Sequence, residues 1–485
     1  MINWKLDLRL LSFIVLFIGL LMGIPTALAF NYQETDAIKG FLVAYAAIAI
    51  FSTTILISTG KSQNKQMLAR DGYLVVTLTW VIATAFSAIP LVASGAYVDY
   101  PSAYFEIMSG FTTTGATVLP EIESLPKSIL FWRSQTNWLG GMGIVVLFVA
   151  LLPALGVSGA LLVGAETVGP TKDKLTPKIK NTALILWSIY IGFSVLETIL
   201  LLMGGLSLYD AVTVTFSTMA AAGFCVKNSS IGTFSSLYVD VVVTIFMLIA
   251  GANFALYYKA ISGKLKSVLR DGELRFYLGI WALVALLAAW HLTFSNTYGS
   301  FGEAFRYSAF LTASILTTTG FATTDYVLWP AFPQMLFFLL FFIGGSAGSA
   351  GGGVKVVRIA TLFKMGRAHI KQRIHPKGIF QVRVGHTTVP EELMRSIATF
   401  FGVYIFTGVV GAVLISLSGL DPFSSIAASF LCLGNIGIGF AEVGPTGNFA
   451  FLPSALKWVC SFLMLVGRLE LFTVFVLFSK HFWKR

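Results

Sequence analysis

Four short turns, rich in threonine or alanine and each ending in glycine, hold the residues best suited to binding an ion. They read Thr112–Gly115, Ala220–Gly223, Thr317–Gly320 and Gly434–Gly437. Each turn lies between two strongly apolar segments and follows a stretch long enough for a short helix. Backbone carbonyls in such turns can replace the water around a cation, because small residues let the backbone adopt the required angles. The pattern predicts a cation filter built from backbone oxygens.

The candidate filter residues are the last three of each turn. A turn that ends in glycine is also an ordinary way to end a helix, so a single copy would say little. Four copies, each after a short helix between apolar spans, favour the filter. The twelve residues are Thr113, Thr114, Gly115, Ala221, Ala222, Gly223, Thr318, Thr319, Gly320, Asn435, Ile436 and Gly437.

The four turns belong to a repeated unit. Their final glycines recur at intervals of 108, 97 and 117 residues, which indicates one module copied four times. Each copy reads membrane helix, half-length helix, glycine turn, membrane helix. An acidic residue precedes each turn, and we expect these acids to be N-caps of the short helices rather than direct ion ligands. They are Asp99, Asp210, Glu303 and Asp421.

The composition is that of a polytopic membrane protein. The chain has 485 residues, of which 56% are hydrophobic and only 11% are charged. About 20 consecutive apolar residues span a bilayer as a helix, so the predicted fold class is all-α. Ten candidate spans lie near 10–30, 38–58, 73–95, 128–152, 181–204, 235–257, 276–295, 330–364, 393–418 and 452–480.

The net charge of +11 is unevenly distributed along the chain. Of the 33 lysines and arginines, 26 lie at the two termini and in alternate connections, which predicts that these segments and both termini are cytoplasmic. The opposite side carries six lysines and arginines against twelve acidic residues, so we expect it to concentrate cations. Because this alternation across the membrane accounts for the positive charge, we exclude nucleic acid as a partner.

The cysteines and histidines give no sign of catalysis or of a resident metal. Cys225, Cys432 and Cys460 lie in or beside apolar segments, without the spacing of a disulfide framework or a metal site. The five histidines are dispersed, and none has a carboxylate or cysteine at ligand spacing. We therefore do not expect an enzyme.

The chain divides into a leading hairpin and four pore repeats. The hairpin, residues 1–58, lacks a glycine turn, and we expect it to serve packing or membrane insertion. The repeats are predicted at 73–165, 181–258, 276–364 and 391–485, with a polar cytoplasmic connection at 365–390. This basic connection is either a docking surface for a soluble partner or a merely solvated loop.

One span is interrupted by ten residues that are all glycine, serine or alanine. They run from 344 to 353, and a helix there is disfavoured because each glycine costs about 1 kcal/mol relative to alanine. Irregular backbone at membrane depth persists where it lines a cavity, which predicts a gate below the filter rather than a passive kink. Arg468 is the only basic residue in mid-span, and we expect it to donate hydrogen bonds to the carbonyls of this segment. The predicted gate residues are Gly344, Gly345, Ser346, Gly348, Gly351, Gly352, Gly353 and Arg468.

These motifs resemble the Trk/Ktr/HKT family, and within it the potassium-translocating subunits of bacterial Trk systems. The resemblance covers essentially the whole chain and rests on the four filter glycines, the glycine-rich break and Arg468. It implies a homodimer in the lipid of a bacterial inner membrane, with one pore per subunit and K⁺ as the transported ion. It also implies an intramembrane gate and a cytosolic nucleotide-binding regulator of the TrkA type, so no organic cofactor is expected on this chain. We expect that regulator on the basic faces around Lys259–Arg275 and Lys355–Arg383.

Other functions remain as alternatives. One is a Na⁺-coupled or less selective K⁺/Na⁺ transporter with the same motifs. The fourth turn departs from the threonine pattern at Gly434 and Asn435, which leaves the preference for K⁺ over Na⁺ open. An alternating-access transporter would be expected to have repeats of opposite orientation. Here every unit begins on the basic side, which favours a pore. A scaffold or receptor would not explain four glycine turns.

Overall fold

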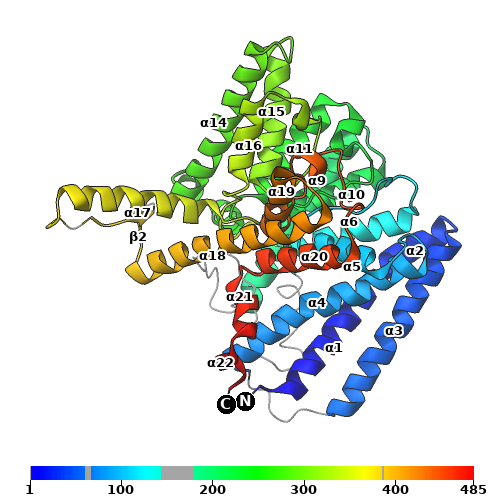
Figure 1. The fold of residues 1–485 in the computed structure, drawn as a ribbon. Coiled ribbons are helices and arrows are strands. Elements are labelled where there is room, and N and C mark those ends of the chain that lie inside the picture. The colour runs from blue at the N-terminus through cyan, green and yellow to red at the C-terminus, as the bar shows by residue number, and fades with distance from the viewer. Residues whose placement is uncertain (1, 61–66, 144–178, 379, 385–386, 485) are drawn as a thin grey trace.

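The computed structural model describes residues 2–60, 67–143, 179–378, 380–384 and 387–484 (Figure 1). Within these ranges the protein is helical apart from one short antiparallel pair, β1 (Arg383–Val384) and β2 (Thr387–Thr388). Six of the described helices are long and apolar enough to cross a membrane, and two further pairs qualify if each bent pair is counted as one span. The fold class predicted from the composition, an all-α polytopic membrane protein, is confirmed.

A leading hairpin is followed by four units with the same order of elements. The hairpin comprises α1 (Trp4–Leu21), α2 (Gly23–Asn31) and α3 (Thr35–Thr59), and it packs against the first long helix of repeat one. The long first helices of the units are α4 (Ala69–Ala93), α9 (Ile179–Met203), α14 (Gly272–Phe294) and α18 (Glu391–Ile415). The short helices are α5 (Tyr100–Phe111), α10 (Leu208–Ala220), α15 (Phe301–Leu316) and α19 (Pro422–Gly434). The second membrane helices begin with α6 (Lys127–Gly141), α11 (Leu237–Ala250), α16 (Ala331–Leu340) and α20 (Ser454–Arg468).

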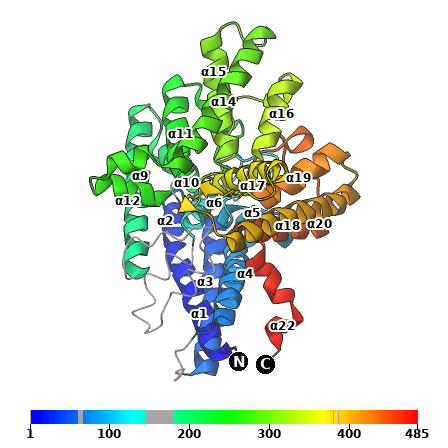
Figure 2. The same ribbon diagram turned by 90° about the vertical axis from the view of Figure 1, so that its left-hand side faces the viewer.

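Short elements complete the chain. Helices α12 (Phe254–Ile261), α17 (Val356–Ile374) and α21 (Phe472–Phe475) follow breaks, while α13 (Leu265–Leu269) and α22 (Lys480–Trp483) lie in a connection and at the C-terminus. Single 3-10 turns occur at η2 (Ser230–Phe234), η3 (Tyr326–Leu328), η4 (Ser416–Ser418), η5 (Ala441–Val443) and η6 (Val476–Phe478). Both views show the N- and C-termini side by side, at the same end of the molecule (Figures 1 and 2).

The short helices form the centre of the molecule. In α5 every residue from Ser102 to Phe111 is buried, and in α19 the run Ala427–Gly434 is buried throughout. Such a helix can be buried on all sides only if other helices surround it, and the longer first helices of the repeats expose one face in return. The glycine turns at the ends of these short helices are therefore held inside protein rather than exposed to lipid.

Two of the four acidic residues cap their short helices as predicted. Asp99 accepts a hydrogen bond from the backbone nitrogen of Ser102 at 3.3 Å, and Asp421 accepts from Phe423 and Ser424 at 2.9 and 3.1 Å. Hydrogen bonds from Ser424 hold the pKa of Asp421 below its usual value. Burial alone would raise the pKa of Asp99, but hydrogen bonds from Ser102 and Ser454 and the charge of Lys457 lower it.

The prediction was wrong for the other two acids. The N-cap of α10 is Ser207 and that of α15 is Ser300, and each serine accepts from the backbone nitrogen of the acidic residue three positions later. Asp210 and Glu303 therefore lie in the first helical turn. A serine three residues before an acid is itself a helix-start signal, and an acid in the first turn is stabilised by the helix dipole.

The predicted break after α16 is confirmed, but breaks also occur where we expected continuous spans. The pair α11 and α12 is bent by 95°, and α20 is followed by a turn of 110° into α21. The first break falls at Gly251, and the second at Glu470 and Leu471, which both adopt positive φ. Two successive left-handed residues end a helix as effectively as a run of glycines does. Glutamate and leucine are not residue types that predict such a conformation. The predicted span 128–152 extends past the described residues.

Helix α17 runs through residue 364, where we expected the third repeat to end. It continues to Ile374 and extends away from the helical bundle in Figure 1, with the β1–β2 pair beside its middle part. Lys364 donates from Nζ to the carbonyl of Arg383 at 2.7 Å, which ties the pair to the helix. The first part of the predicted polar connection is thus helical.

The leading hairpin is attached to repeat one through Glu34. Its carboxylate accepts from the backbone nitrogens of Lys127 and Ser128 at 2.7 and 3.1 Å. These are the first N–H groups of α6, whose own N-cap residue, Pro126, has no side chain able to accept them. Glu34 therefore caps a helix that lies 93 residues further along the chain.

We predict that Glu34→Ala lowers the free energy of unfolding by about 1–2 kcal/mol, because orphan N–H groups of α6 lose their acceptor. Thermal unfolding in detergent measures this. Asp36→Ala is the matched control, since Asp36 forms only an exposed pair with Lys39 and such pairs contribute almost nothing. Equal thermal midpoints for the two variants would contradict the capping role of Glu34.

Candidate functional site

The four predicted turns meet around one point. Built onto the backbone, a Cβ at Gly115 would lie 2.2 Å from the nitrogen of Gly223, and one at Gly223 would lie 3.0 Å from the carbonyl oxygen of Gly320. A Cβ at Gly320 would lie 2.9 Å from the Cα of Gly437, and one at Gly437 would lie 2.6 Å from the carbonyl oxygen of Thr114. The contacts run from each repeat to the next and return from the fourth to the first. The loops therefore form a closed ring in which a side chain has no room.

The four loops share an unusual backbone conformation. The residue two positions before each final glycine is left-handed, although none of these residues is glycine. The φ values are 56° at Thr113, 53° at Ala221, 62° at Thr318 and 53° at Asn435. A left-handed residue other than glycine costs roughly 1–2 kcal/mol, and such strain persists where the surroundings enforce it and commonly marks a functional site.

A repeated hydrogen bond fixes each loop and leaves its carbonyls available. In every repeat the residue before the final glycine donates its N–H to the carbonyl five positions back. The bonds are Thr114 to Ser109, Ala222 to Ser217, Thr319 to Ser314 and Ile436 to Leu431, at 2.8 to 3.1 Å. Within the described ranges, no hydrogen bond ends on the carbonyls of these four donor residues. A buried carbonyl without a donor is costly, and a bound cation would compensate for it.

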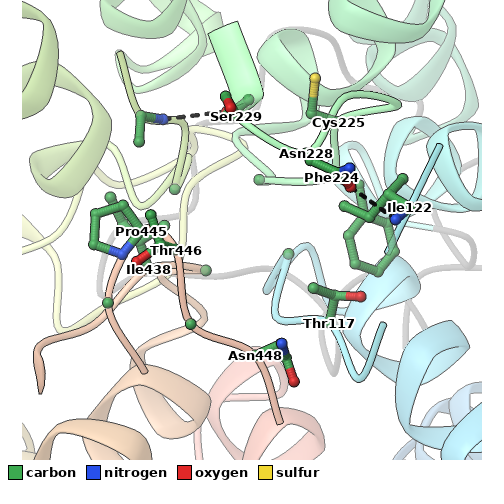
Figure 3. A pocket seen from close by; sticks show the side chains of 18 of the residues that line it. Thr117, Ile122, Phe224, Cys225, Asn228, Ser229, Ile438, Pro445, Thr446 and Asn448 are labelled. Carbon is green, nitrogen blue, oxygen red and sulfur yellow. Dashed lines mark hydrogen bonds between the residues drawn. The ribbon is translucent and has the colours of Figure 1, made fainter. Parts of the chain in front are cut away.

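A cavity of about 460 Å³ opens above the ring and is lined by segments from all four repeats (Figure 3). All four final glycines contribute to its lining. Figure 3 shows Thr117, Phe224, Asn228, Thr446 and Asn448 on different sides of this space. None of the residues 344–353 lines it, so the glycine-rich segment lies on the other side of the ring.

A buried ion pair supports the first loop. Glu106 accepts from Nε and Nη2 of Arg133 at 2.9 and 2.6 Å, and both side chains are essentially inaccessible to solvent. Glu106 also accepts from the hydroxyl of Thr117 and the nitrogen of Val118 at 2.8 and 2.9 Å, which holds the chain as it leaves the filter loop. Both residues were counted among the charges of the outer side, and because the pair is neutral, the excess of acids on that side is unchanged.

The predicted gate segment is non-helical and contacts the underside of the ring. The nitrogen of Gly352 donates to the hydroxyl of Thr318 at 2.7 Å, and that of Gly353 donates to the carbonyl of Gly434 at 2.9 Å. Ala350 donates to the carbonyl of Ala250 at 3.1 Å, at the break of the second repeat. The freed backbone groups of two broken helices thus satisfy one another.

Arg468 lies where three of these parts meet. Nη1 donates to the carbonyl of Ala350 at 2.8 Å and to the hydroxyl of Thr113 at 3.1 Å. Nη2 donates to the carbonyls of Gly140 and Gly141, the last residues of α6, at 2.7 and 3.1 Å. Arg468 thus bonds to the gate segment through one carbonyl, that of Ala350. Its other bonds, to one hydroxyl and two carbonyls, are to the first repeat. Glu470 instead pairs with Arg358 at 2.7 Å.

Sequence reasoning missed another buried cation beside the gate segment, Lys355. We had assigned Lys355 and Arg358 to a cytoplasmic docking surface, and both are buried. Lys355 adopts a φ of 82° and donates from Nζ to the carbonyl of Gly351. A lysine directly after a glycine-rich break was the available signal, but counting charges along the sequence cannot tell a lysine that turns inward from one in a solvated loop.

The comparisons with known proteins agree over nearly the full length. The family model TrkH, described as a cation transport protein, matches residues 38–485. The Trk system potassium uptake proteins TrkH of Salmonella typhimurium and Escherichia coli are 37% and 36% identical over 479 residues, which is 98% of this chain and of each relative. The crystal structure of the potassium transporter TrkH from Vibrio parahaemolyticus superposes with a TM-score of 0.89 at 32% identity, and covers 100% of both chains.

We predict that Glu106→Gln destabilises the protein by about 3–5 kcal/mol, because it leaves the Arg133 guanidinium buried without an opposite charge. Adding Arg133→Met should recover much of the loss. Asp240→Asn is the comparison, since its partner Arg306 is partly exposed and should be affected less. Thermal midpoints of the purified variants measure these effects, and a double variant no more stable than Glu106→Gln alone would refute the explanation.

Proposed function

The chain belongs to the TrkH family of cation transport proteins, and on this basis we propose that it carries potassium ions into a bacterial cell through a gated pore. It is a transport protein and not an enzyme. The observation that carries the proposal is the ring of four glycine loops, whose carbonyls at Thr114, Ala222, Thr319 and Ile436 accept no hydrogen bond from the part of the chain that the structure describes. Its relatives named as potassium uptake proteins support the choice of ion.

In the proposed filter, K⁺ leaves its water at the ring and is coordinated by carbonyls from all four repeats. The carbonyls best placed for this are those of Thr114, Ala222, Thr319 and Ile436, because within the described residues no hydrogen bond ends on them. Rigid spacing of the carbonyls would favour K⁺ over the smaller Na⁺. The final glycines are required because any Cβ would press on the neighbouring loop.

Below the filter, we assign the gate to residues 344–353 together with Arg468. The segment crosses under the ring, and its bonds to Thr318 and Gly434 support a closed position. Arg468 and Lys355 place two positive charges next to this segment, which would oppose the passage of a cation. A charge-assisted hydrogen bond contributes roughly 1.5–3 kcal/mol, which a regulator could overcome.

The orientation that we propose puts the filter vestibule outside and both termini in the cytoplasm, in the inner membrane. The basic connections of the sequence support this by the positive-inside rule. The adjacent termini agree with an even number of crossings, and Arg70 of the first basic loop donates to the carbonyl of Lys484 at 2.6 Å.

We further propose that the protein acts as a homodimer in lipid, with a cytosolic nucleotide-binding subunit of the TrkA type and no role for nucleic acid. The naming of the relatives as components of a Trk system supports a partner subunit. With Lys355 and Arg358 buried, the remaining basic faces are the connection 259–275 and the exposed outer part of α17, which includes Lys371 and Arg373.

Uptake of radioactive rubidium into liposomes that contain only this protein tests the proposed function. We predict that Gly320→Ser lowers K⁺/Na⁺ discrimination by about tenfold or more, a change of ~1.4 kcal/mol. Its φ is 82°, and an added Cβ would lie 2.5 Å from the carbonyl oxygen of Ile436. Gly115→Ser and Gly223→Ser should act in the same way.

Gly302→Ser is the matched control for the filter variants. Gly302 lies on the exposed face of α15 in the same repeat as Gly320, and an added Cβ there meets nothing within 4 Å. If Gly320→Ser leaves the permeability ratio as high as Gly302→Ser does, the filter assignment fails. Vesicles that take up Na⁺ and rubidium equally well would instead favour the less selective transporter.

We predict that Arg468→Ala raises the basal K⁺ flux without any partner by about tenfold, because the bond to Ala350 that holds the gate segment is lost. Deleting two residues of the glycine segment should act in the same direction. Arg395→Ala, which removes an arginine from an exposed pair, is the control and should leave the flux unchanged. Basal flux equal to that of the control in a folded Arg468→Ala protein would leave the glycines as a passive kink.

A further inference from the structure

The fourth filter loop differs from the others at its left-handed position. The first three loops carry Thr113, Ala221 and Thr318 there, and the fourth carries Asn435. Asparagine tolerates this conformation better than threonine or alanine, so the backbone alone gives one reason for the exchange. The contacts of the buried Asn435 side chain give a second reason.

The amide of Asn435 bridges two other parts of the protein. Its Nδ2 donates to the hydroxyl of Thr114, in the first filter loop, at 2.9 Å. The same nitrogen donates to the carbonyl of Met464, in α20, at 3.0 Å. An amide nitrogen has two protons, so both donors are used. A threonine here has one proton and could not make both bonds.

The hydrogen bonds continue from Thr114 in a defined direction. The hydroxyl of Thr112 donates to the carbonyl of Met108 in α5 at 2.6 Å, which uses its only proton. The contact of 2.8 Å between the hydroxyls of Thr112 and Thr114 must then be a donation from Thr114. The oxygen of Thr114 is left as the acceptor for Asn435. A chain of hydrogen bonds thus joins α20 to α5 through the hydroxyls of Thr114 and Thr112.

The third repeat provides the same arrangement without the amide. The hydroxyl of Thr317 donates to the carbonyl of Ala313 at 2.8 Å, and the hydroxyls of Thr317 and Thr319 are 2.7 Å apart. Thr319 therefore donates to Thr317, as Thr114 does to Thr112. Among the described residues, no hydrogen bond from another repeat reaches the hydroxyl of Thr319. The link between repeats is particular to Thr114.

The bridge lies at the seam where the last repeat closes the ring against the first. A Cβ at Gly437 would lie 2.6 Å from the carbonyl oxygen of Thr114, so the fourth loop is in direct contact with a proposed coordinating carbonyl. The side chain of Asn435 has little room to turn away, because its Oδ1 would lie 3.0 Å from a Cβ at Gly467 and 3.4 Å from one at Gly352.

We propose that Asn435 is a positioning residue that fixes the Thr114 carbonyl at the seam between the fourth and first filter loops and thereby sets the discrimination between K⁺ and Na⁺. The amide does not touch the ion. It acts through the Thr114 hydroxyl, whose position determines how the adjacent carbonyl faces the ring. This inference rests on the proposed function of the ring as a potassium filter.

The experiment compares two pairs of variants of the full chain in liposomes. Thr114→Val removes the acceptor without changing shape, and Thr319→Val does the same in the third loop. Asn435→Gly removes the amide and keeps the left-handed backbone unstrained, and Ala221→Gly makes the matching backbone change where the side chain has no bond. Thr114→Ser retains the hydroxyl and tests rescue.

We expect Thr114→Val and Asn435→Gly each to lower the K⁺/Na⁺ permeability ratio by about threefold to tenfold, the effect of one lost hydrogen bond. The permeability ratio of the double variant should be no lower than that of the less selective single variant, because both substitutions remove the same link. Thr319→Val and Ala221→Gly should each lower the ratio less than Thr114→Val and Asn435→Gly do, because the link remains intact in both, and Thr114→Ser should restore most of the ratio because it keeps the hydroxyl.

Ratios for Thr319→Val or Ala221→Gly as low as those of their counterparts would overturn the inference, and so would an unchanged ratio in Thr114→Val. Additive losses in the double variant would overturn it as well. These outcomes assume an unmodified protein that selects K⁺. Failure of the unmodified protein to take up K⁺ in preference to Na⁺ overturns the proposed function itself, so the two failures are distinguishable.

Discussion

Backbone groups that leave a helix inside a membrane must find partners within the protein, because no water is available to them. Within the described residues, repeats two, three and four each break their second helix at this depth, and the freed groups are paired across repeats. Ala350 of the glycine segment bonds to the break at Ala250, and Gly353 bonds to the end of α19 at Gly434. Arg468 supplies further donors to the end of α6 and to Ala350. The breaks therefore depend on one another and enclose the centre of the protein.

The four glycine loops are the exception to this pairing, and the exception supports the function that we propose for them. Their amides are bonded within each loop, while the carbonyls of Thr114, Ala222, Thr319 and Ile436 accept no hydrogen bond within the described residues. Four left-handed residues and four tightly packed glycines hold these oxygens in place. A preorganised set of acceptors without donors is suited to a dehydrated cation. Glu106 accepts hydrogen bonds from Thr117 and Val118 just after the first loop, and the Asn435 amide donates to the Thr114 hydroxyl within it.

Sequence reasoning predicted the parts that depend on local backbone preference. The glycine turns and the break at 344–353 could be predicted because glycine disfavours a helix wherever it lies in the chain. The breaks at Gly251 and at Glu470 and Leu471 could not be, because a single glycine does not break every helix and because tertiary contacts impose positive φ on Glu470 and Leu471. Lys355 and Arg358 were misplaced for a related reason, since both belong to a helix whose start is buried. That Arg468 bonds to the end of α6 could likewise be seen only in the three-dimensional structure.

The central claim is that one ring of backbone carbonyls coordinates the transported ion. Anomalous diffraction from crystals grown with thallium, which replaces potassium, tests it most directly. The account predicts thallium on the axis of the ring, within coordination distance of the carbonyls of Thr114, Ala222, Thr319 and Ile436. Thallium found only among the acidic residues of the outer mouth, with none on this axis, would contradict it.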